Sequence, residues 1–351
     1  MCIAFFVWTE HRFLVCHNRD EYFSRPTTGT EWWPNESTSG NDRQSFRILA
    51  PRDGVSGGTW FGYEQTTGRC AFLTNIDGAT DSGSTKRTHA SSRGEIVVNY
   101  LRSDPSCSAL DYLRREFGCG DGADVAVTGN TGCGYYAGFN LVVFSGRDLA
   151  YVSNRGGGIG ISIGNTNHRT GPVALEQGRH YGLSNSLLHQ PLPKVREGLE
   201  LFRTAVHRSN SVYRDSYIGI NTGEQPRCRH KIDDPDDNKD DENRLFQELK
   251  ELMRHAGPSH RPEGVAHNSS LLLSDASSEG ERTPGEKRLE RRRSSICVPI
   301  DDTEYGTRTT IRFLLQTNQQ EPRLLRWTEQ HRNPDTLDWE GCLEFGCESS
   351  L

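Results

Sequence analysis

The chain has 351 residues, a hydrophobic share of 33% and a mean hydropathy of −0.72. That composition supplies too little apolar material for every residue to lie in or near a core, so part of the chain is expected to be disordered. A formal charge of −6 gives no overall attraction to nucleic acid or to an anionic membrane. No apolar run approaches the roughly 18 residues that span a bilayer. Neither a nucleic-acid partner nor a transmembrane segment is expected.

The ten cysteines form no CxxC pair and no cluster with zinc-finger spacing, so no metal site and no disulfide framework is expected. Cys16, Cys70 and Cys297 lie inside apolar runs, where a free thiol behaves as a small hydrophobic side chain. The apolar run 2–8 is short and has no basic residue before it, so it is predicted to be a buried strand and not a signal peptide. A reducing compartment fits these features, and the expected location is the cytoplasm.

Most of the chain is predicted to consist of adjacent strand pairs with helices between them. Residues 25–58 contain several prolines and are predicted to be rich in turns. The residues before a helix predicted over 96–103 supply capping side chains, and helical spacing of apolar residues predicts another helix over about 193–207. Strands are predicted at 2–8, 12–17, 69–76, 138–144, 149–154, 295–299, 309–316 and 324–328, with a further short helix at 110–116.

The composition changes between residues 221 and 295. An acidic run at 233–242 is followed by a segment rich in Ser, Pro, Gly and charged residues, and then by a basic run at 287–293. This segment is predicted to be a low-complexity, disordered insertion that holds one helix at about 242–255. The predicted organisation is therefore one domain made of residues 1–220 and 296–351. Its order of strand pairs and helices favours a layered α+β fold.

Cys2 is the most informative candidate for chemistry. Removal of Met1 would place a thiol and a free α-amine on one residue. Such an amine can act as the base that activates its own side-chain nucleophile. The alternative is an ordinary buried cysteine at the start of a strand.

A second candidate is the polar run 18–21, which closes the second predicted strand. Side chains alternate between the two faces of an extended chain. Arg19 would then lower the pKa of a nearby thiol, and Asp20 would orient the terminal amine. The alternative is a charged strand end with a surface ion pair, which contributes little stability.

These residues belong to a longer ordered set of motifs that resembles the NRDE family, the family of transport and Golgi organisation. The motifs run in order along all of the chain except the insertion. They are Met1-Cys2-Ile3, Asn18-Arg19-Asp20-Glu21 with Ser24-Arg25-Pro26, Gly57-Gly58-Thr59-Trp60-Phe61-Gly62, Leu73-Thr74-Asn75, Arg93-Gly94-Glu95, Gly138-Phe139-Asn140-Leu141, Tyr181-Gly182-Leu183-Ser184-Asn185 and Tyr305-Gly306-Thr307-Arg308-Thr309.

The family in turn resembles the N-terminal nucleophile hydrolases of the bile salt hydrolase and penicillin V acylase type. That resemblance implies a four-layer αββα sandwich. Carried onto this sequence, it implies six catalytic positions with three kinds of role. They are Cys2 as nucleophile, Arg19 and Asp20 as polarising groups, Asn75 and Asn185 as oxyanion donors, and Arg308 as a late structural cation.

Arg19 and Asp20 are adjacent here but further apart in those hydrolases, and turn capping is the alternative role for the two asparagines. For Arg308 the alternative to catalysis is a buried ion pair.

Two functions follow from the resemblance. One is a non-enzymatic role in Golgi organisation, protein secretion, or the handling of haem or acyl-CoA, with a cytoplasmic location that includes association with the Golgi or mitochondria. Haem is implied by the resemblance alone, because the sequence carries no CxxCH motif. The other is a cysteine amidohydrolase that acts on C–N bonds other than peptide bonds. The sequence leaves open whether the chain is an enzyme, which ligand it takes and whether it forms oligomers.

Overall fold

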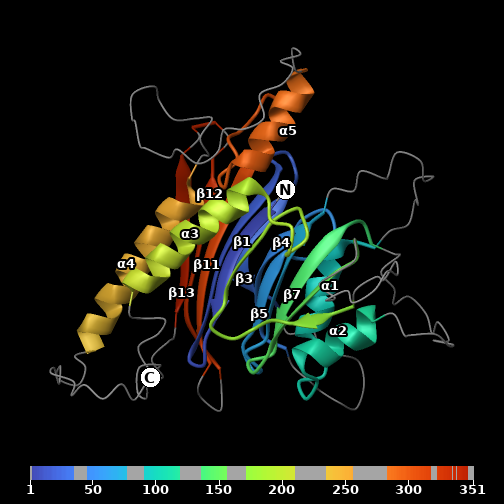
Figure 1. Cartoon of the computed structure of the whole chain (residues 1–351), viewed down its shortest axis with the longest axis vertical. Coiled ribbons are helices and arrows are strands. Elements are labelled where there is room, and N and C mark those ends of the chain that lie inside the picture. Colours follow the sequence, from blue (N-terminus) through green and yellow to red (C-terminus); the bar gives the residue numbers. More distant parts are fainter. Residues whose placement is uncertain are drawn as a thin grey trace.

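The computed structural model of the chain describes residues 2–34, 46–76, 91–118, 136–155, 171–209, 235–255, 283–317, 322–333, 335–336 and 338–346. These residues form a mixed α/β fold with two antiparallel sheets and, in the described ranges, five helices (Figure 1). The helices are α1 (Arg93–Leu101), α2 (Ala109–Phe117), α3 (Pro193–Arg208), α4 (Pro235–Met253) and α5 (Pro284–Ser294).

The first sheet has six strands in the order β10-β1-β2-β11-β12-β13. It is built on a hairpin of two apolar strands, in which the Thr9 amide donates to the Arg12 carbonyl at 2.8 Å. The late strand β11 pairs with β2, so both ends of the sequence meet in the centre of this sheet. Its strands are β1 (Cys2–Trp8), β2 (Arg12–Tyr22), β10 (His180–Leu183), β11 (Tyr305–Gln316), β12 (Arg323–Arg332) and β13 (Trp339–Gly346).

The second sheet has seven strands, and each pairs with its neighbour in the sequence. Antiparallel neighbours can be joined by a tight turn, as β7 and β8 are, whereas α1 and α2 lie between β6 and β7. Its strands are β3 (Thr27–Trp32), β4 (Ile48–Asp53), β5 (Phe61–Glu64), β6 (Cys70–Asn75), β7 (Phe139–Phe144), β8 (Leu149–Ser153) and β9 (Val173–Ala174).

Aromatic side chains pack the two sheets against each other. Ring contacts join Phe13 to Phe144 at 4.5 Å and Phe6 to Phe72 at 5.2 Å. Trp327 of the first sheet is fully buried against Phe61 of the second, with ring centroids 5.0 Å apart. Aromatic rings bury large apolar areas, so these contacts are a main source of the stability of the sheet-on-sheet core.

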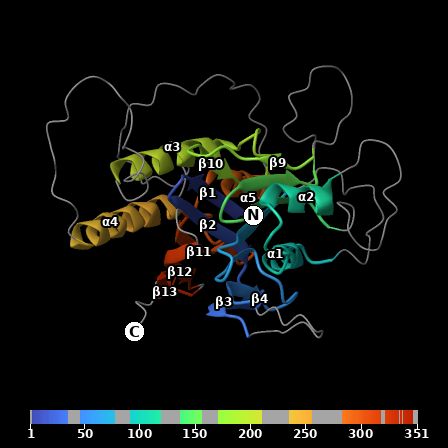
Figure 2. The same ribbon diagram turned by 90° about the horizontal axis from the view of Figure 1, so that it is seen from below.

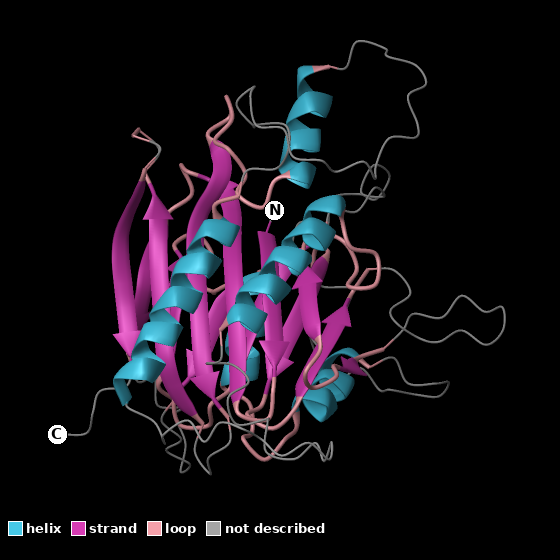
Figure 3. Cartoon of the chain, turned by 60° about the vertical axis from the view of Figure 1, so that its left-hand side comes forward, coloured by secondary structure: helices cyan, strands magenta, loops and turns pink. Residues whose placement is uncertain are grey.

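Helices α1 to α4 lie on the outer faces of the two sheets (Figures 2 and 3). Helices α3 and α4 cover the first sheet, where a separate apolar cluster joins Phe5 of β1 to Phe202 of α3 and Leu249 of α4. Helices α1 and α2 contact the second sheet. Each of these two short helices begins at a serine whose side chain accepts a main-chain hydrogen bond, as predicted for α1.

The predicted strands at 2–8, 12–17, 69–76, 138–144, 149–154, 309–316 and 324–328 are all confirmed, as are the predicted helices. Two predictions are wrong. The stretch 25–58 holds β3 and β4: Pro26 and Pro34 flank β3, and Pro51 lies in β4 where the register against β3 shifts. Residues 295–299 form no strand, although Val298 exchanges main-chain and side-chain hydrogen bonds with Thr307.

The disorder predicted for residues 221–295 does not extend to α4. Its apolar side chains recur at helical spacing and are buried on the first sheet, although acidic residues dominate its composition. The buried residues are Leu245, Phe246, Leu249, Leu252 and Met253. The segment 283–294 is also helical, as α5, but buries no side chain. Residues 221–234 and 256–282 lie outside the described ranges.

Candidate functional site

The end of β2 carries polar side chains to both faces of the first sheet. Cys2 lies opposite Arg19 in the β1–β2 register, and both side chains face the second sheet, as Ala4 and Phe6 further along β1 also do. Asn18 and Asp20 face the helix side, where Leu14 and Cys16 belong to the apolar cluster under α3 and α4. The alternation expected of an extended chain is therefore present.

Cys2 and Asn185 are in direct contact. The Cys2 amide donates to Asn185 Oδ1 at 3.2 Å, and Ser184 Oγ donates to the Cys2 carbonyl at 2.7 Å. Asn185 Nδ2 donates to the Asn75 carbonyl oxygen at 2.8 Å. Because Asn75 ends β6 and Cys2 begins β1, Asn185 bridges the two sheets. The contact uses the main-chain oxygen of Asn75 and not its side-chain amide.

A buried polar network supports this bridge from the second sheet. Thr74 Oγ1 donates to the Ser184 carbonyl at 2.6 Å, and Asn140 Nδ2 donates to the same carbonyl at 3.0 Å. Tyr151 Oη donates in turn to Asn140 Oδ1 at 2.7 Å. Such a satisfied network fixes the position of the chain that carries Asn185. Thr74 and Asn140 were visible in the sequence only as members of the ordered motifs.

The Cys2 side chain is nearly sealed from solvent, with 4% of the residue exposed. Burial raises the pKa of the Cys2 thiol above its ordinary value near 9, and the nearby Arg19 charge opposes this only in part. The thiol is therefore in its neutral form at pH 7. The thiolate is the reactive species, so Cys2 is not a preformed nucleophile in this arrangement.

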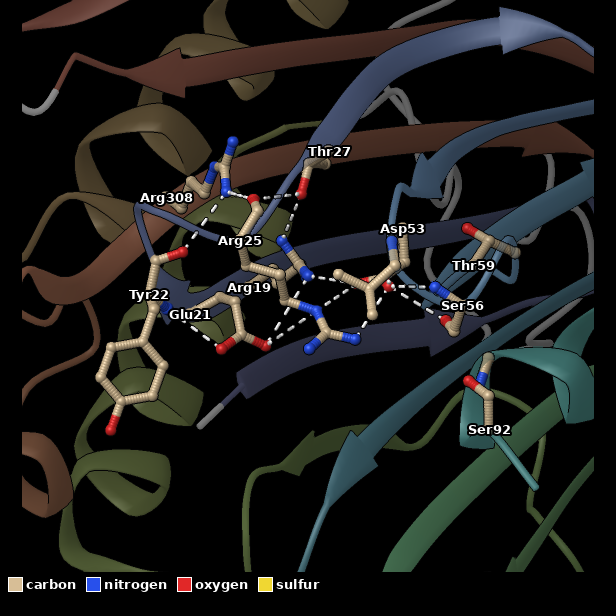
Figure 4. A network of polar contacts seen from close by, with 12 residues as sticks. Arg19, Glu21, Tyr22, Arg25, Thr27, Asp53, Ser56, Thr59, Ser92 and Arg308 are labelled. Atoms are coloured by element: carbon tan, nitrogen blue, oxygen red, sulfur yellow. Dashed lines mark hydrogen bonds and ion pairs between the residues drawn. The ribbon is translucent and has the colours of Figure 1, made fainter. Parts of the chain in front are cut away.

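Arg19 is bound from several directions (Figure 4). Its guanidinium donates to Asp53 Oδ2 at 2.8 Å and to Thr27 Oγ1 at 3.0 Å, and it lies 4.2 Å from the centroid of the Trp60 ring. Asp53 also accepts two hydrogen bonds from Arg25, at 2.6 and 2.8 Å. Burial raises the pKa of Asp53, but the hydrogen bonds from Arg25 and Ser56 outweigh it and lower that pKa to about 2.

Arg308 lies at the edge of this cluster because of a β-bulge. The register of β11 against β2 slips between Thr307 and Thr309, so Arg308 has no opposite residue on β2. Its guanidinium donates to the main-chain carbonyls of Tyr22 and Arg25 (Figure 4). Within the described ranges, no carboxylate lies at ion-pair distance from Arg308. Burial, and then the Arg19 charge, lower its pKa.

Asp20 lies on the opposite face of β2 and is 2% exposed. Thr307 Oγ1 donates to Asp20 Oδ1 at 2.6 Å, and Tyr305 Oη donates to the Asp20 carbonyl at 3.1 Å. Burial raises the pKa of Asp20, although the charges of Lys194 and Arg292 oppose the rise. The carboxylate is close enough to Cys2 to contribute to the raised pKa of its thiol.

The six predicted residues therefore fall into three groups. Cys2, Asn75 and Asn185 are joined by hydrogen bonds, Arg19 and Arg308 share one cationic cluster, and Asp20 lies behind the sheet. In the described part of the chain, no hydrogen bond or ion pair joins Arg308 to Cys2. Sequence reasoning gave no role to Asp53 or Thr307, which bind Arg19 and Asp20. Thr307 was visible only as a member of the Tyr305–Thr309 motif, and Asp53 only by its closeness to the Gly57 motif.

His17 is a further buried polar group near this site. Its Nε2 lies 3.2 Å from the Leu73 carbonyl oxygen, and the ring contacts Phe61 and Phe72. Burial lowers the pKa of His17 to about 4, so the imidazole is neutral at pH 7. Its packing identifies it as a core residue that positions β2 against β6.

Together, these features define a mixed α/β protein with two stacked antiparallel sheets and a cysteine at the start of the first strand, held by an asparagine that bridges the sheets. The family model described as Transport and Golgi organisation 2 matches residues 1–330. The chain belongs to the Transport and Golgi organisation 2 family, as its ordered motifs predicted.

Individual relatives carry the same name. A Homo sapiens protein named Transport and Golgi organization protein 2 homolog is 32% identical over 231 residues, which cover 62% of this chain and 69% of that protein. The Bos taurus protein of the same name is 33% identical over 225 residues, with the same coverage. Transport and Golgi organization protein 2 of Drosophila melanogaster is 28% identical over 221 residues, covering 59% of this chain and 65% of that protein. Among the described residues, no helix is long and apolar enough to cross a membrane.

Proposed function

We propose that this protein acts in Golgi organisation and protein secretion as a carrier of a small amphipathic ligand, either haem or an acyl-CoA. The name of the family supports the cellular role, and the proposed location is cytoplasmic with association to the Golgi or to mitochondria. In this proposal, a hydrolase-like site serves for binding. Haem is treated as cargo and not as a resident cofactor.

The observation that carries the proposal is the charge balance around Arg308. Three arginines (Arg19, Arg25 and Arg308) share two carboxylates, Glu21 and Asp53. Asp53 is already committed to Arg19 and Arg25, and among the described residues the hydrogen bonds of Arg308 go to main-chain oxygens. Because the three arginines outnumber the two carboxylates, the half-buried Arg308 guanidinium favours an incoming anion, since charge-assisted hydrogen bonds are the stronger ones.

The ligand chemistry follows from that excess charge. Haem carries carboxylates on its propionate groups, and an acyl-CoA carries phosphates; both join an anionic end to an apolar body. Guanidinium groups match either anion in geometry. The anionic end of the ligand would contact Arg308, while the neutral Cys2 thiol would take no part in binding.

Equilibrium titration of the full chain tests this proposal. Haem is followed by its absorbance and a short-chain acyl-CoA, kept below its micelle concentration, by calorimetry. We expect saturable binding of at least one of the two, and a weakening of about tenfold or more in Arg308→Gln. Arg179→Gln is the matched control, because Arg179 is an exposed arginine paired with Glu176. Absence of saturable binding of both ligands would overturn the proposal.

A second candidate function is a cysteine N-terminal nucleophile amidohydrolase, with the four-layer αββα sandwich of that class as the finer description of the fold. The contact between the Cys2 main-chain nitrogen and Asn185 favours it, since that nitrogen becomes an α-amine once Met1 is removed. The amine would take the thiol proton, and sulfur would attack the carbonyl carbon of a non-peptide amide. The C–N bond would then break as the amine group leaves with the proton, and water would release the acyl group from sulfur.

Mass measurement of the mature chain comes first in a test of this second function. Retention of Met1 excludes the mechanism. If Met1 is absent, labelling with a thiol reagent should modify Cys2, and amide turnover should be lost in Cys2→Ala. Turnover without saturable binding of haem or acyl-CoA would favour the hydrolase over the carrier.

A further inference from the structure

Helix α5 ends in a basic segment, Arg291-Arg292-Arg293-Ser294-Ser295, that the site does not use. Protein kinases that prefer basic substrates recognise a serine preceded by arginines two and three positions earlier, a case of specificity by charge pattern. Both Ser294 and Ser295 satisfy that spacing. The sequence alone therefore does not distinguish between the two serines.

The structure separates them by accessibility. Ser294 is the last residue of α5, is partly exposed, and its hydroxyl donates to the Arg291 carbonyl at 3.3 Å. Ser295 is fully buried. A phosphate on Ser295 would place a charge close to −2 inside the protein, which is strongly unfavourable.

We propose that Ser294 is a phosphorylation site for a kinase that prefers basic substrates. The kinase would transfer the γ-phosphoryl group of ATP to Ser294 Oγ. The O–H bond of the serine breaks and an O–P bond forms, while the proton passes to the kinase and ADP leaves. Ser295 is excluded in the folded protein.

The helix is suited to such recognition because its side chains lie at the surface. No side chain of α5 is buried, and Figure 1 shows the helix projecting beyond the strand ends. Kinases bind their substrates as extended chain, so the last turn of α5 must open. Contacts of Arg292 restrain that turn. Arg292 forms an ion pair with Asp301 at 2.6 Å and lies 3.9 Å from the Tyr305 ring centroid, and the buried Lys194 Nζ donates to the Arg292 carbonyl at 2.7 Å.

The segment that follows Ser294 leads to the candidate site. Asn18 Nδ2 donates to the Ile296 carbonyl at 3.1 Å, and the Val298 amide donates to Thr307 Oγ1 at 2.6 Å. Thr307 is the residue that binds the Asp20 carboxylate. Phosphate at Ser294 therefore lies at the start of a short chain segment that contacts the helix-facing side of the site.

The test uses the full chain, ATP and a cAMP-dependent-type kinase, with the modified residue mapped by mass spectrometry. We expect phosphate on Ser294, its loss in Ser294→Ala and its retention in Ser295→Ala. A peptide of residues 286–299 serves as the unfolded reference and should also be modified. Phosphate on Ser295 of the folded chain, incorporation that survives Ser294→Ala, or no incorporation in either the chain or the peptide would each overturn the proposal.

A second pair of variants tests the opening of the helix. Asp301→Asn frees Arg292 and should raise the phosphorylation rate of the full chain by about two- to fivefold, the range expected for loss of one partly exposed ion pair. Asp302→Asn is the control, because its partner Arg288 lies outside the recognised spacing. Failure of the folded chain to react while the peptide reacts, with no gain in Asp301→Asn, would also overturn the proposal.

Discussion

The two faces of β2 near its end differ in how they handle charge. On the face toward the second sheet, Arg19 belongs to a cluster with Arg25 and Asp53 in which ion pairs connect the charged groups. On the face toward the helices, Asp20 is a buried carboxylate that accepts a hydrogen bond from the Thr307 hydroxyl. The two residues are adjacent in sequence, and yet they belong to separate environments.

This difference shows that neighbouring residues of one sequence motif can belong to two separate sites. A motif read along a strand mixes residues from both faces, since side chains alternate. The Arg19 face also holds Cys2 and Arg308, which makes it the face suited to a ligand. The Asp20 face joins the strand to the segment after α5, and we infer a supporting role for it. The predictions below test this division.

The largest effect is expected for Arg19→Met. This change leaves Asp53 without its buried partner, and loss of one partner of a buried pair costs about 3–5 kcal/mol of unfolding free energy. Arg25→Met is the matched control, because that arginine side chain is 35% exposed and its loss should cost about 1 kcal/mol or less. Urea denaturation measures both, and equal losses would contradict the buried role of Arg19.

Thr307→Val should have the next largest effect. The hydroxyl donates to the Asp20 carboxylate and accepts a hydrogen bond from the Val298 amide, so its removal takes one hydrogen bond from each of two buried polar groups. The expected loss is about 1–3 kcal/mol of unfolding free energy. Thr204→Val on the exposed side of α3 is the control, for which we expect a change below about 0.5 kcal/mol. Thermal or urea denaturation distinguishes the two.

The pH dependence of stability should have opposite signs on the two faces. The pKa of Asp53 is lowered to about 2, so its contribution is present above its ordinary pKa near 4 and is lost as the pH falls through 2. The difference in stability between the unmodified chain and Asp53→Asn should be about 1–2 kcal/mol at pH 6 and should shrink on acidification.

Asp20 should behave in the reverse way. Its pKa is raised, so its favourable contribution is present below its ordinary pKa and is lost as the pH rises through the folded-state value. Relative to Asp20→Asn, the unmodified chain should therefore be most stable in acid and lose that advantage toward pH 7. Denaturation curves at several pH values measure both variants, and parallel pH profiles would contradict the comparison.

The smallest effect is expected for Glu21→Gln. Glu21 lies 3.7 Å from Arg19 and 3.9 Å from Arg25, and its side chain is 23% exposed. Long, partly exposed ion pairs contribute little, so the change in unfolding free energy should stay below about 0.5 kcal/mol. A loss as large as that of Arg19→Met would mean that Glu21 and not Asp53 neutralises the cluster.

Much of the first sheet was predictable because its strands are continuous apolar runs. The β1–β2 hairpin and β11 follow directly from such runs, and the ordered motifs indicated Cys2 and Asn185 as site residues. Their contact was not predictable, since it depends on long-range pairing of β1 with β10. The bulge at Arg308 was not predictable either, because a register shift depends on how two strands pair and cannot be recognised in the sequence of one strand.

The composition of other segments misled the prediction. Residues 27–32 and 48–53 contain polar residues and a proline and still pair as strands, because tertiary packing outweighs local propensity. Helix α4 was predicted only from about residue 242, because acidic residues dominate its first turns; it begins at Pro235. Asp53 was not indicated by any motif spacing in the sequence, so its role in holding Arg19 could be recognised only from the structure.

Ligand binding by Arg308→Gln and Asp20→Asn, measured side by side with the unmodified chain, tests the central claim most directly. The ligand-facing role of the Arg19 face predicts that Arg308→Gln weakens the binding of haem or acyl-CoA by about tenfold or more. Asp20→Asn should leave the dissociation constant within about twofold, because its carboxylate lies behind the sheet. The reverse order of effects would contradict the account.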